Sequence, residues 1–526
     1  MISAGCREAA EAGAAVLASG GNAADAAIAA SAVQCVRELP WCGLGGDAFA
    51  LVSGPDGGPE ALNGAGAAPR ALATASVPGG RLPRFGPLSI SVPGLVDAWR
   101  RLSERHGSRP LAGLIEPAAE LADEGFALDD AFARALDRVR VAVGPGDPFV
   151  AEFCEGNGSA AGDRFRLPAL ARTLRKISAG GPSAFYTGSL ASDLVSTVDR
   201  LGGLLSAGDM AAHSCDFEPP ITVRYGSADV SVTPPVSMGW VLLQQLLLYE
   251  RLDGRSIDDE ADRIDLMVRC KHAAFSDLAG MPRWQEASDV AAVLGEDSLD
   301  RWCSIIDGQR RSVLAPAGPA TAPAAAGGND TTCLSVADGR GLMVTFIHSL
   351  FNEFGSRVVV PGTGIVLNDR LAKQPAHLRP DGGRDRPHRP LHTLVGYHVA
   401  HRGRRMVGAT PGGRGQVQTN FQVLRAMIDD GAGPQAAVAG PRWLSGAPRL
   451  PGAEDLLFLE PGFPAGLGSE LARRGHTMAA DGAASDSDLF GSCTVAGVNC
   501  RTGRAFGAAD HRRGAALVTV TREETP

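Results

Sequence analysis

The chain has 526 residues, of which 50 are basic and 58 acidic, so its formal net charge at neutral pH is −8. Hydrophobic residues make up 44% of the chain and charged residues 21%, which is typical of a globular protein and excludes disorder of the chain as a whole. The acidic balance, without a long basic run, argues against nucleic acid as a partner, because phosphate binding requires clustered lysine and arginine.

The predicted elements begin with helices. Apolar residues recur at helical spacing through the first forty residues, and a glycine pair at 20–21 would end one helix. Asn22 would cap the next helix, which we expect to run to about Arg37. A strand is predicted over 48–52, and short strands near 221–233. Further helices are predicted over residues 92–107, 110–125, 128–141, 188–201 and 237–252.

No segment reaches the roughly 18 apolar residues of a membrane-spanning helix. Near the N-terminus, Arg7, Glu8 and Glu11 interrupt the stretch where a signal peptide would be apolar. The ten cysteines include no CxxC pair, so their spacing fits neither a zinc site nor a small disulfide framework. We therefore expect a soluble, cytoplasmic protein with reduced cysteines and no membrane partner.

Residues 315–328 contain only alanine, proline, glycine and threonine, a composition that can neither build a core nor hold a regular element. We predict a flexible linker over 315–329. Strands are predicted directly after it, over 331–337 and 342–350, with a hairpin turn at Asp338. A third apolar run, at 357–360 and 364–367, continues the pattern.

A threonine that starts a strand after a loose loop can cleave its own chain. The Thr331 hydroxyl can attack the preceding carbonyl, convert the amide to an ester, and let water release the upstream segment. The freed residue then has an α-amine with a pKa near ~8, which can act as the base for its own hydroxyl. An aspartate–threonine pair after a linker is, however, more often an ordinary turn and strand.

Two other patterns are weaker. The segment GLGGDA at 43–48 mimics a dinucleotide-binding loop, but it follows a predicted helix and not a strand. His213 with Cys215 and Cys270 with His272 are isolated pairs, so we expect no metal site from them. No GxSxG elbow occurs, which argues against an α/β-hydrolase.

A series of short motifs carries a resemblance along the chain. The motifs are GGNAADAA at 20–27, GLGGDAF at 43–49, SVPGLVDAW at 91–99, DTTCLSVAD at 330–338, FGS and VPGTGIVLN within 354–368, TPGG at 410–413 and AGPRW at 439–443. In this order and spacing, they make the chain similar to the γ-glutamyltranspeptidase family of N-terminal-nucleophile hydrolases over nearly its whole length. The resemblance implies an α+β fold, a four-layer α/β/β/α sandwich of two stacked antiparallel sheets with an additional helical part.

The resemblance also implies a site. Self-cleavage between Asp330 and Thr331 would give a large fragment, 1–330, and a small fragment, 331–526, which together form one integrated fold. Thr331 matches the nucleophile, and Ser349 matches a hydroxyl, commonly a threonine in the family, that hydrogen-bonds it.

The backbone N–H groups of a glycine pair, here Gly412 and Gly413, bind the developing oxyanion in this family. Neither a metal nor an organic cofactor is implied. The expected partners are a small-molecule substrate and the two fragments of the same precursor.

The substrate-binding positions depart from the family pattern. The arginine that holds the glutamate α-carboxylate falls on Ala65, and the arginine of a related subgroup falls on Ala67. The acidic residue for the substrate ammonium falls on Lys373. Four other positions also differ, where the family has a serine pair, a histidine and an asparagine: Leu391 and His392, Cys333, and Phe351.

The acyl-transfer residues are therefore kept and the glutamyl clamp is lost. We expect hydrolysis of a small non-glutamyl substrate, with an acyl carboxylate but no amine held by Lys373, Arg370 or His392. Family relatives include an oxamate amidohydrolase, cephalosporin acylases, and homologues linked to C–C bond cleavage in pyrroline-type antibiotic pathways. Two alternatives stay open: a genuine γ-glutamyl transferase or glutathione hydrolase, and a non-catalytic binding protein. The retention of Thr331 and Ser349 argues against the second.

Overall fold

The computed structural model describes residues 1–55, 57–281, 287–309, 330–372, 374, 388–446, 455–480 and 487–520. The linker predicted at 315–329 and the candidate anion-binding residue Lys373 lie outside these described residues. Asp330 and Thr331 lie in one strand, Asp330–Ala337.

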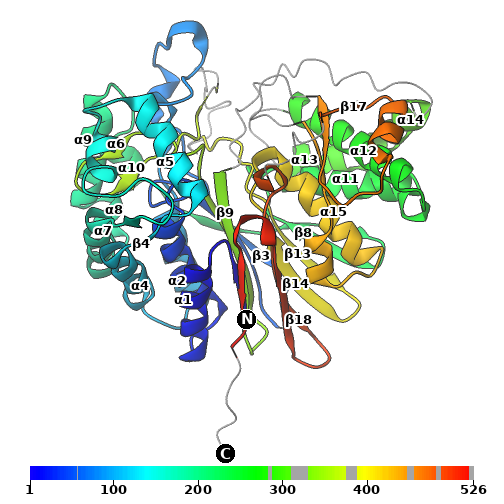
Figure 1. The fold of residues 1–526 in the computed structure, drawn as a ribbon, viewed down its shortest axis with the longest axis horizontal. Coiled ribbons are helices and arrows are strands. Elements are labelled where there is room, and N and C mark those ends of the chain that lie inside the picture. The colour runs from blue at the N-terminus through cyan, green and yellow to red at the C-terminus, as the bar shows by residue number, and fades with distance from the viewer. Residues whose placement is uncertain are drawn as a thin grey trace, which may run out of the picture.

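Two antiparallel sheets stack at the centre of the molecule (Figure 1). The first sheet has seven strands in the order β20 (Ala516–Val518), β1 (Ile2–Ala4), β9 (Asp330–Ala337), β10 (Met343–Phe351), β2 (Asp47–Ser53), β3 (Glu60–Gly64) and β6 (Asp216–Glu218). The second has six, in the order β19 (Ala505–Ala509), β18 (Thr494–Asn499), β14 (Arg404–Ala409), β13 (Gly396–His401), β8 (Ala228–Val232) and β7 (Ile221–Tyr225).

Helices cover the outer face of each sheet, on the left and right of Figure 1. The layer on the first sheet contains α1 (Arg7–Ala18), α2 (Ala23–Arg37), α3 (Leu95–His106), α4 (Leu111–Glu124), α5 (Asp130–Val143), α6 (Pro148–Phe153), α7 (Pro168–Gly180), α8 (Ser183–Tyr186), α9 (Ser189–Arg200) and α10 (Ala207–Ala211). The other half contains α11 (Gly239–Arg251), α12 (Glu260–Gly280), α13 (Ala287–Leu294), α14 (Glu296–Gln309), α15 (Gln416–Ile428), α16 (Pro434–Ala439) and α17 (Leu467–Arg473). The predicted four-layer α/β/β/α sandwich is therefore confirmed.

Smaller elements connect these layers: β4 (Phe126–Ala127) with β5 (Arg164–Phe165), β11 (Val359–Val360) with β12 (Ile365–Val366), and a small sheet of β15 (Trp443–Ser445), β16 (Leu456–Leu459) and β17 (Thr477–Met478). Two large apolar clusters lie between the helices and the sheets, and smaller clusters lie between the two sheets. The helices predicted between 92 and 252 agree with α3, α4, α5, α9 and α11. The other helices after residue 40 were not predicted, among them the longer α7, α12, α14 and α15.

The first residues of the chain differ from the prediction that the first forty are helical. Ile2–Ala4 form strand β1, which pairs with β9 on one side and β20 on the other. Three residues are too few to show a periodicity, and both flanking strands lie hundreds of residues away in the sequence. The two predicted helices follow, and Gly20, at φ 92°, ends the first of them as expected.

The predicted hairpin after the linker forms strands β9 and β10. Asp338 makes its turn, because its carboxylate accepts hydrogen bonds from the N–H groups of Arg340 and Leu342. Along β9, Leu334 packs in the cluster under the helices, whereas Cys333 packs between the two sheets. By the alternation of a strand, Thr331 lies on the face toward the second sheet.

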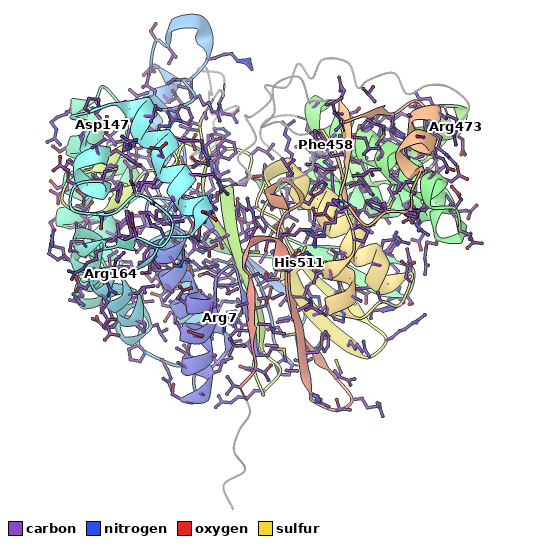
Figure 2. All side chains as sticks on the ribbon, in the orientation of Figure 1. Arg7, Asp147, Arg164, Phe458, Arg473 and His511 are labelled. Carbon is purple, nitrogen blue, oxygen red and sulfur yellow. The ribbon has the colours of Figure 1, made fainter. Side chains whose placement is uncertain are left out.

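Charged side chains such as Arg7 and Arg473 project from the outer helices into solvent (Figure 2). Among the described helices, none is both long and apolar enough to span a bilayer.

Asn22 caps α2 as predicted, and its removal should be measurable. Its Oδ1 accepts hydrogen bonds of 3.0 Å from the N–H groups of Ala24 and Asp25, and the Asp25 carboxylate accepts the Asn22 N–H. We expect Asn22→Ala to lower the free energy of unfolding by about 1 kcal/mol, measured by urea denaturation. Asn22→Ser keeps a capping oxygen and should lose less; equal losses in both variants would contradict the capping role.

Candidate active site

Thr331 and Ser349 face each other from neighbouring strands. The Thr331 hydroxyl donates a hydrogen bond of 3.2 Å to Ser349 Oγ. Thr331 is 4% exposed and Ser349 1% exposed, so bulk water does not compete for this contact. The structure thus brings together the two hydroxyls that the sequence resemblance paired.

An irregular strand end holds the Ser349 hydroxyl in place. The register of β10 against β9 shifts between His348 and Phe351, and Phe351 has a positive φ of 87°. In this conformation the Phe351 N–H donates a 2.8 Å hydrogen bond to Ser349 Oγ. Gly46 approaches closely, because a Cβ there would lie 2.5 Å from the Ser349 carbonyl oxygen. The GLGG segment therefore packs against the strand end that bears Ser349.

Thr332 is anchored on the opposite face of β9. Its hydroxyl accepts a 2.7 Å hydrogen bond from Gln34 Nε2 and donates one of 2.8 Å to Glu38 Oε2. Burial raises the pKa of Glu38, although its hydrogen-bond donors oppose that effect. These contacts fix which face of β9 turns toward α2. The sequence analysis missed both partners, Gln34 of α2 and Glu38, which directly follows it; their spacing of about one helical turn was the available signal.

Gly412 and Gly413 lie in the turn between β14 and α15. Their φ angles are 131° and 53°, a backbone region that favours glycine. They lead into a short helix at 413–415, whose first N–H groups have no acceptor within the helix. Ala409, which ends β14, packs with Cys333 between the sheets, so the glycine pair and Thr331 lie at the same end of the sandwich.

The Asp47 carboxylate lies next to two other predicted site residues, Arg370 and His392. In the β2–β10 pairing it lies opposite Ser349, and its Oδ1 accepts a 2.8 Å hydrogen bond from the Gly66 N–H. Its Oδ2 lies 3.4 Å from Arg370 Nε and 3.7 Å from His392 Nε2. Of the three residues predicted to bind a substrate anion, the structure therefore brings Arg370 and His392 together. The sequence analysis did not predict Asp47 as the residue that joins them.

Arg370 keeps unused hydrogen-bonding capacity. It is 1% exposed, and within the described part of the chain neither its Nη1 nor its Nη2 has a hydrogen-bond partner. Its guanidinium lies 4.6 Å from the centre of the Phe351 ring, a cation–π contact with the residue that replaces the family's asparagine. A buried guanidinium with two free nitrogens is costly, and a carboxylate can satisfy both nitrogens at once.

The neighbouring groups have shifted pKa values. Burial raises the pKa of Asp47 to about 6, although Arg370 opposes this effect. Burial, together with Arg370 and Arg389, holds the pKa of His392 well below its usual value, so the imidazole is neutral. Neither ring nitrogen of His392 has a hydrogen-bond partner among the described residues. The site therefore presents one free guanidinium edge and one neutral imidazole.

Ala65 stands where the family has the arginine that binds the glutamate α-carboxylate, so this position supplies no positive charge. Ala65 is fully buried and packs between the sheets with Phe49 and Leu394. The site thus combines a hydroxyl pair, a glycine turn and an arginine from a different segment of the chain.

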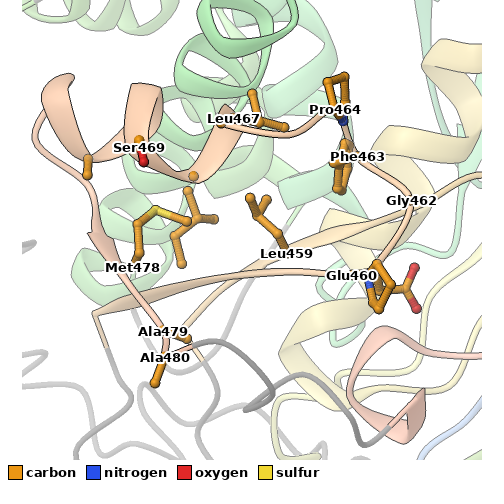
Figure 3. Close-up of a pocket in the computed structure, with 15 residues that line it drawn as sticks. Leu459, Glu460, Gly462, Phe463, Pro464, Leu467, Ser469, Met478, Ala479 and Ala480 are labelled. Carbon is orange, nitrogen blue, oxygen red and sulfur yellow. The ribbon is translucent and has the colours of Figure 1, made fainter.

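Other candidate sites do not share these residues. A cavity of about 680 Å³ is lined by residues between Leu457 and Ala480, among them Phe463 and Met478 (Figure 3), and includes none of the predicted site residues. His213 and Cys215, the pair set aside as metal ligands, do lie near Asp97. Hydrogen bonds from Arg100 and from the Cys215 N–H already engage the two oxygens of that carboxylate, which gives it a structural role.

Asp369, next to Arg370, should make the free energy of unfolding depend on pH. It accepts hydrogen bonds from the Asn352 backbone N–H and side-chain amide, and burial raises its pKa to about 7. Between about pH 4 and 7 the folded carboxyl keeps a proton that the unfolded chain has lost. Its contribution to the free energy of unfolding should therefore fall as the pH rises through this interval.

Urea denaturation at several pH values would measure this effect. We expect Asp369→Asn to flatten the curve of unfolding free energy against pH between about 4 and 7. Asp137→Asn, at an exposed position, should leave the slope as in the wild type. A curve for Asp369→Asn that runs parallel to the wild type would show that the carboxyl does not titrate in this way.

Comparison with known proteins places this geometry in a family. The sequence model of the gamma-glutamyltranspeptidase family matches residues 9–520. An oxamate amidohydrolase proenzyme of Klebsiella pneumoniae is 32% identical over 483 residues, which are 88% of each chain. A glutathione hydrolase-like proenzyme of Bacillus subtilis, YwrD, is 31% identical over 452 residues and 83% of each chain.

A solved structure, a cephalosporin acylase from Bacillus halodurans, is similar over 99% of this chain and 96% of its own, with a TM-score of 0.85 and 30% identity. The match thus extends over both sheets and both helical layers. The chain belongs to the γ-glutamyltranspeptidase family and is an enzyme of the N-terminal-nucleophile hydrolase type.

Proposed function

We propose that this chain is a self-processing amidohydrolase for small amides whose acyl half has a carboxylate and no α-amine. The observation that carries the proposal is the buried Arg370, which contacts Phe351 on the strand that bears Ser349 and has two nitrogens without a hydrogen-bond partner in the described part of the chain. The similarity to an oxamate amidohydrolase supports it, because oxamate has a carboxylate next to its amide and has no amine.

Processing would begin at the bond between Asp330 and Thr331. The Thr331 hydroxyl attacks the Asp330 carbonyl, and the amide becomes an ester as its nitrogen takes up the hydroxyl proton. Water then hydrolyses the ester, which leaves a carboxylate on Asp330 and a free α-amine on Thr331. The products are fragments 1–330 and 331–526, which stay together because both sheets contain strands of each fragment, joined at the β1–β9, β2–β10 and β8–β13 pairings.

Catalysis would reuse the same hydroxyl. The α-amine of Thr331 takes the hydroxyl proton while the oxygen attacks the substrate carbonyl, and Ser349 holds that hydroxyl in line. The N–H groups of Gly412 and Gly413 stabilise the oxyanion, an effect typically worth about 3–4 kcal/mol per donor. The leaving amine takes the proton, and water hydrolyses the acyl-enzyme to release the acid.

Arg370 would hold the acyl carboxylate through its two free nitrogens, with the neutral His392 as a further polar partner. The same surroundings disfavour a γ-glutamyl group. Its α-ammonium would need a buried anion, but the Asp47 carboxylate already neighbours Arg370. Its α-carboxylate would find the apolar Ala65 at the family's clamp position. Lys373 retains its proposed anion-binding role from the sequence alone.

Intact-mass spectrometry tests the nucleophile. Wild-type protein should give two fragments, the smaller beginning at Thr331, whereas Thr331→Ala should stay uncut because it has no attacking oxygen. Ser349→Thr should be processed, and Ser349→Ala more slowly. An uncut wild-type chain would contradict self-processing and would favour the alternative of a non-catalytic binding protein.

Paired substrates test the acyl specificity. Glutaryl 4-nitroanilide and γ-glutamyl 4-nitroanilide differ only in the α-amine, so we expect a higher kcat/KM for the glutaryl compound. Shorter oxalyl, malonyl and succinyl anilides would locate the preferred chain length. Arg370→Met should raise KM by roughly 100-fold through the lost charged contact. Arg175→Met, at an exposed ion pair on α7, should leave KM unchanged.

Preference for the γ-glutamyl compound would instead establish the alternative, a genuine γ-glutamyl transferase or glutathione hydrolase. Processing of Arg370→Met, followed by mass spectrometry, would show whether that variant folds.

A further inference from the structure

Two cysteines and a histidine meet on the helix side of the strand that bears Ser349. Cys35 lies in α2, Cys42 lies shortly after this helix, and His348 lies in β10. The two Sγ atoms and one ring nitrogen of His348 all lie within 4.8 Å of one another. All three residues are 0% exposed, so three donor atoms converge where bulk water has no access.

The surroundings of His348 determine which ring nitrogen has a free lone pair. Gln34 Nε2 donates hydrogen bonds of 2.7 Å to Thr332 Oγ1 and 3.2 Å to the Cys333 carbonyl. The other end of this amide, Oε1, is therefore an acceptor, and His348 Nε2 lies 3.0 Å from it. Because a hydrogen bond to that oxygen needs a donor, the proton of the neutral ring lies on Nε2. The lone pair is then on Nδ1, which has no hydrogen-bond partner in the described part of the chain.

The imidazole of His348 has the form of a metal ligand. Burial lowers its pKa to about 3, so the ring stays neutral, as a metal-bound histidine must be. A metal-bound histidine usually donates its second ring N–H to an oxygen of the protein, and Gln34 Oε1 accepts that bond here. A buried lone pair without a donor is unfavourable, and a cation would satisfy it.

The Cys42 thiol makes only weak hydrogen bonds, which a metal ion could replace. Its Sγ lies 3.2 Å from the Gln34 carbonyl oxygen and 3.5 Å from that of Glu38. These two oxygens also accept backbone N–H groups, those of Glu38 and Cys42 respectively, so loss of the thiol proton would leave neither oxygen without a donor. Burial raises the pKa of this thiol well above its usual value, so a strongly bound cation is needed to displace the proton.

The donor set selects the kind of ion. Two sulfurs and an imidazole suit Zn²⁺ and Cu⁺, whereas Mg²⁺ and Ca²⁺ require oxygen ligands. Charge favours Zn²⁺, because two thiolates and a divalent cation form a neutral buried group. Coordination number favours Cu⁺, which accepts three ligands, because Zn²⁺ usually takes four. Both ions share the affinity for sulfur that this group offers.

The position of the group gives a bound ion a structural role. Helix α2 packs on β9 and β10 (Figure 1). His348 and Thr332 lie opposite each other in the pairing of these strands, and both side chains contact α2. Thr331 instead lies on the face toward the second sheet. An ion at this group would therefore join α2 to β10 and would not contact the substrate.

We propose that Cys35, Cys42 and His348 bind one thiophilic metal ion, Zn²⁺ or Cu⁺, which fastens α2 to the strand of Ser349. Each thiol that coordinates the ion as a thiolate releases its proton to solvent, and the lone pair of His348 is the third ligand. The site requires neither self-cleavage nor a substrate. The spacing of the cysteines did not predict it, because the third ligand comes from a distant strand.

Native mass spectrometry of the full-length chain tests the binding. The wild-type protein would be expressed in medium supplemented with zinc or with copper and purified with a reductant. We expect about one metal ion per chain in one of the two preparations, and that preparation identifies the ion. A chain without bound metal in both preparations would overturn the proposal.

X-ray absorption fine structure of the loaded wild-type protein identifies the ligands without any substitution. For zinc we expect two sulfur neighbours at ~2.3 Å and a nitrogen neighbour at ~2.0 Å. A single sulfur neighbour would assign the ion to the group of Cys215, His213 and Asp97, which has one thiol. A shell without sulfur would show a surface ion. Either result would overturn the assignment.

Variants test each ligand separately. Cys35→Ala, Cys42→Ala and His348→Gln should each reduce the bound metal from about one ion per chain to near zero. Cys215→Ala, which removes another fully buried cysteine, is the matched control and should keep the ion. Circular dichroism would show which variants fold. Metal retained in all three ligand variants would contradict the site.

Thermal unfolding tests the structural role. Removal of the ion with a chelator should lower the midpoint of unfolding of the wild-type protein, because an ion that binds only the folded chain stabilises it. The midpoint of Cys42→Ala should not respond to the chelator, and an unchanged wild-type midpoint would contradict the structural role. Thr331→Ala should bind the ion as the wild type does. An uncut chain that still binds metal would therefore refute the proposed function and leave this site intact.

Discussion

The arrangement of the site depends on one carboxylate without access to water, that of Asp47. A buried carboxylate needs hydrogen bonds and a cation nearby, and this one takes them from two separate segments of the chain, the Gly66 N–H and Arg370, while the neutral His392 lies 3.7 Å away. Because Asp47 also lies opposite Ser349 in the sheet, its partners are held beside the hydroxyl pair. The need to compensate one charge thus places the candidate substrate-binding groups next to the nucleophile.

The contact with Asp47 uses only part of the hydrogen-bonding capacity of Arg370. Asp47 contacts the Nε edge of Arg370, and the Phe351 ring covers a face of the guanidinium. Among the residues that the structure describes, the two remaining nitrogens have no hydrogen-bond partner. Burial raises the pKa of Asp369 and of Asp47 against the effect of Arg370, so the negative charge around this arginine decreases when these carboxyls take up protons. An incoming carboxylate would add negative charge to the cluster and would favour the protonated form of both aspartates.

The sequence predicted those features that short segments determine. The Asn22 cap and the hairpin from the Thr331 strand to the Ser349 strand depend on neighbouring residues, and the family motifs located the hydroxyls and the glycine pair. Strand β1 could not be predicted, because its pairing partners are hundreds of residues away. The Glu38 contact with Thr332 and the role of Asp47 were missed for the same reason: each joins segments that only the folded chain brings together. The departures from the family pattern at Ala65 and Phe351 were visible in the sequence. Arg370, which stacks on Phe351, was only one of three residues that the sequence suggested for binding the substrate anion.

The composition of the two sheets has a consequence for how the protein is made. In the first sheet β1 lies between β9 and β20, and β2 pairs with β10, whereas in the second sheet β8 pairs with β13. Both sheets are therefore built from residues on either side of position 330. In the intact precursor these pairings form within one molecule. After a cut at 330–331 the same sheets would have to assemble from two chains, and the rate of refolding would depend on protein concentration. The uncut chain is therefore the form suited to folding, and a processed enzyme that unfolds at the dilution of a cell would recover its structure far more slowly than it first acquired it.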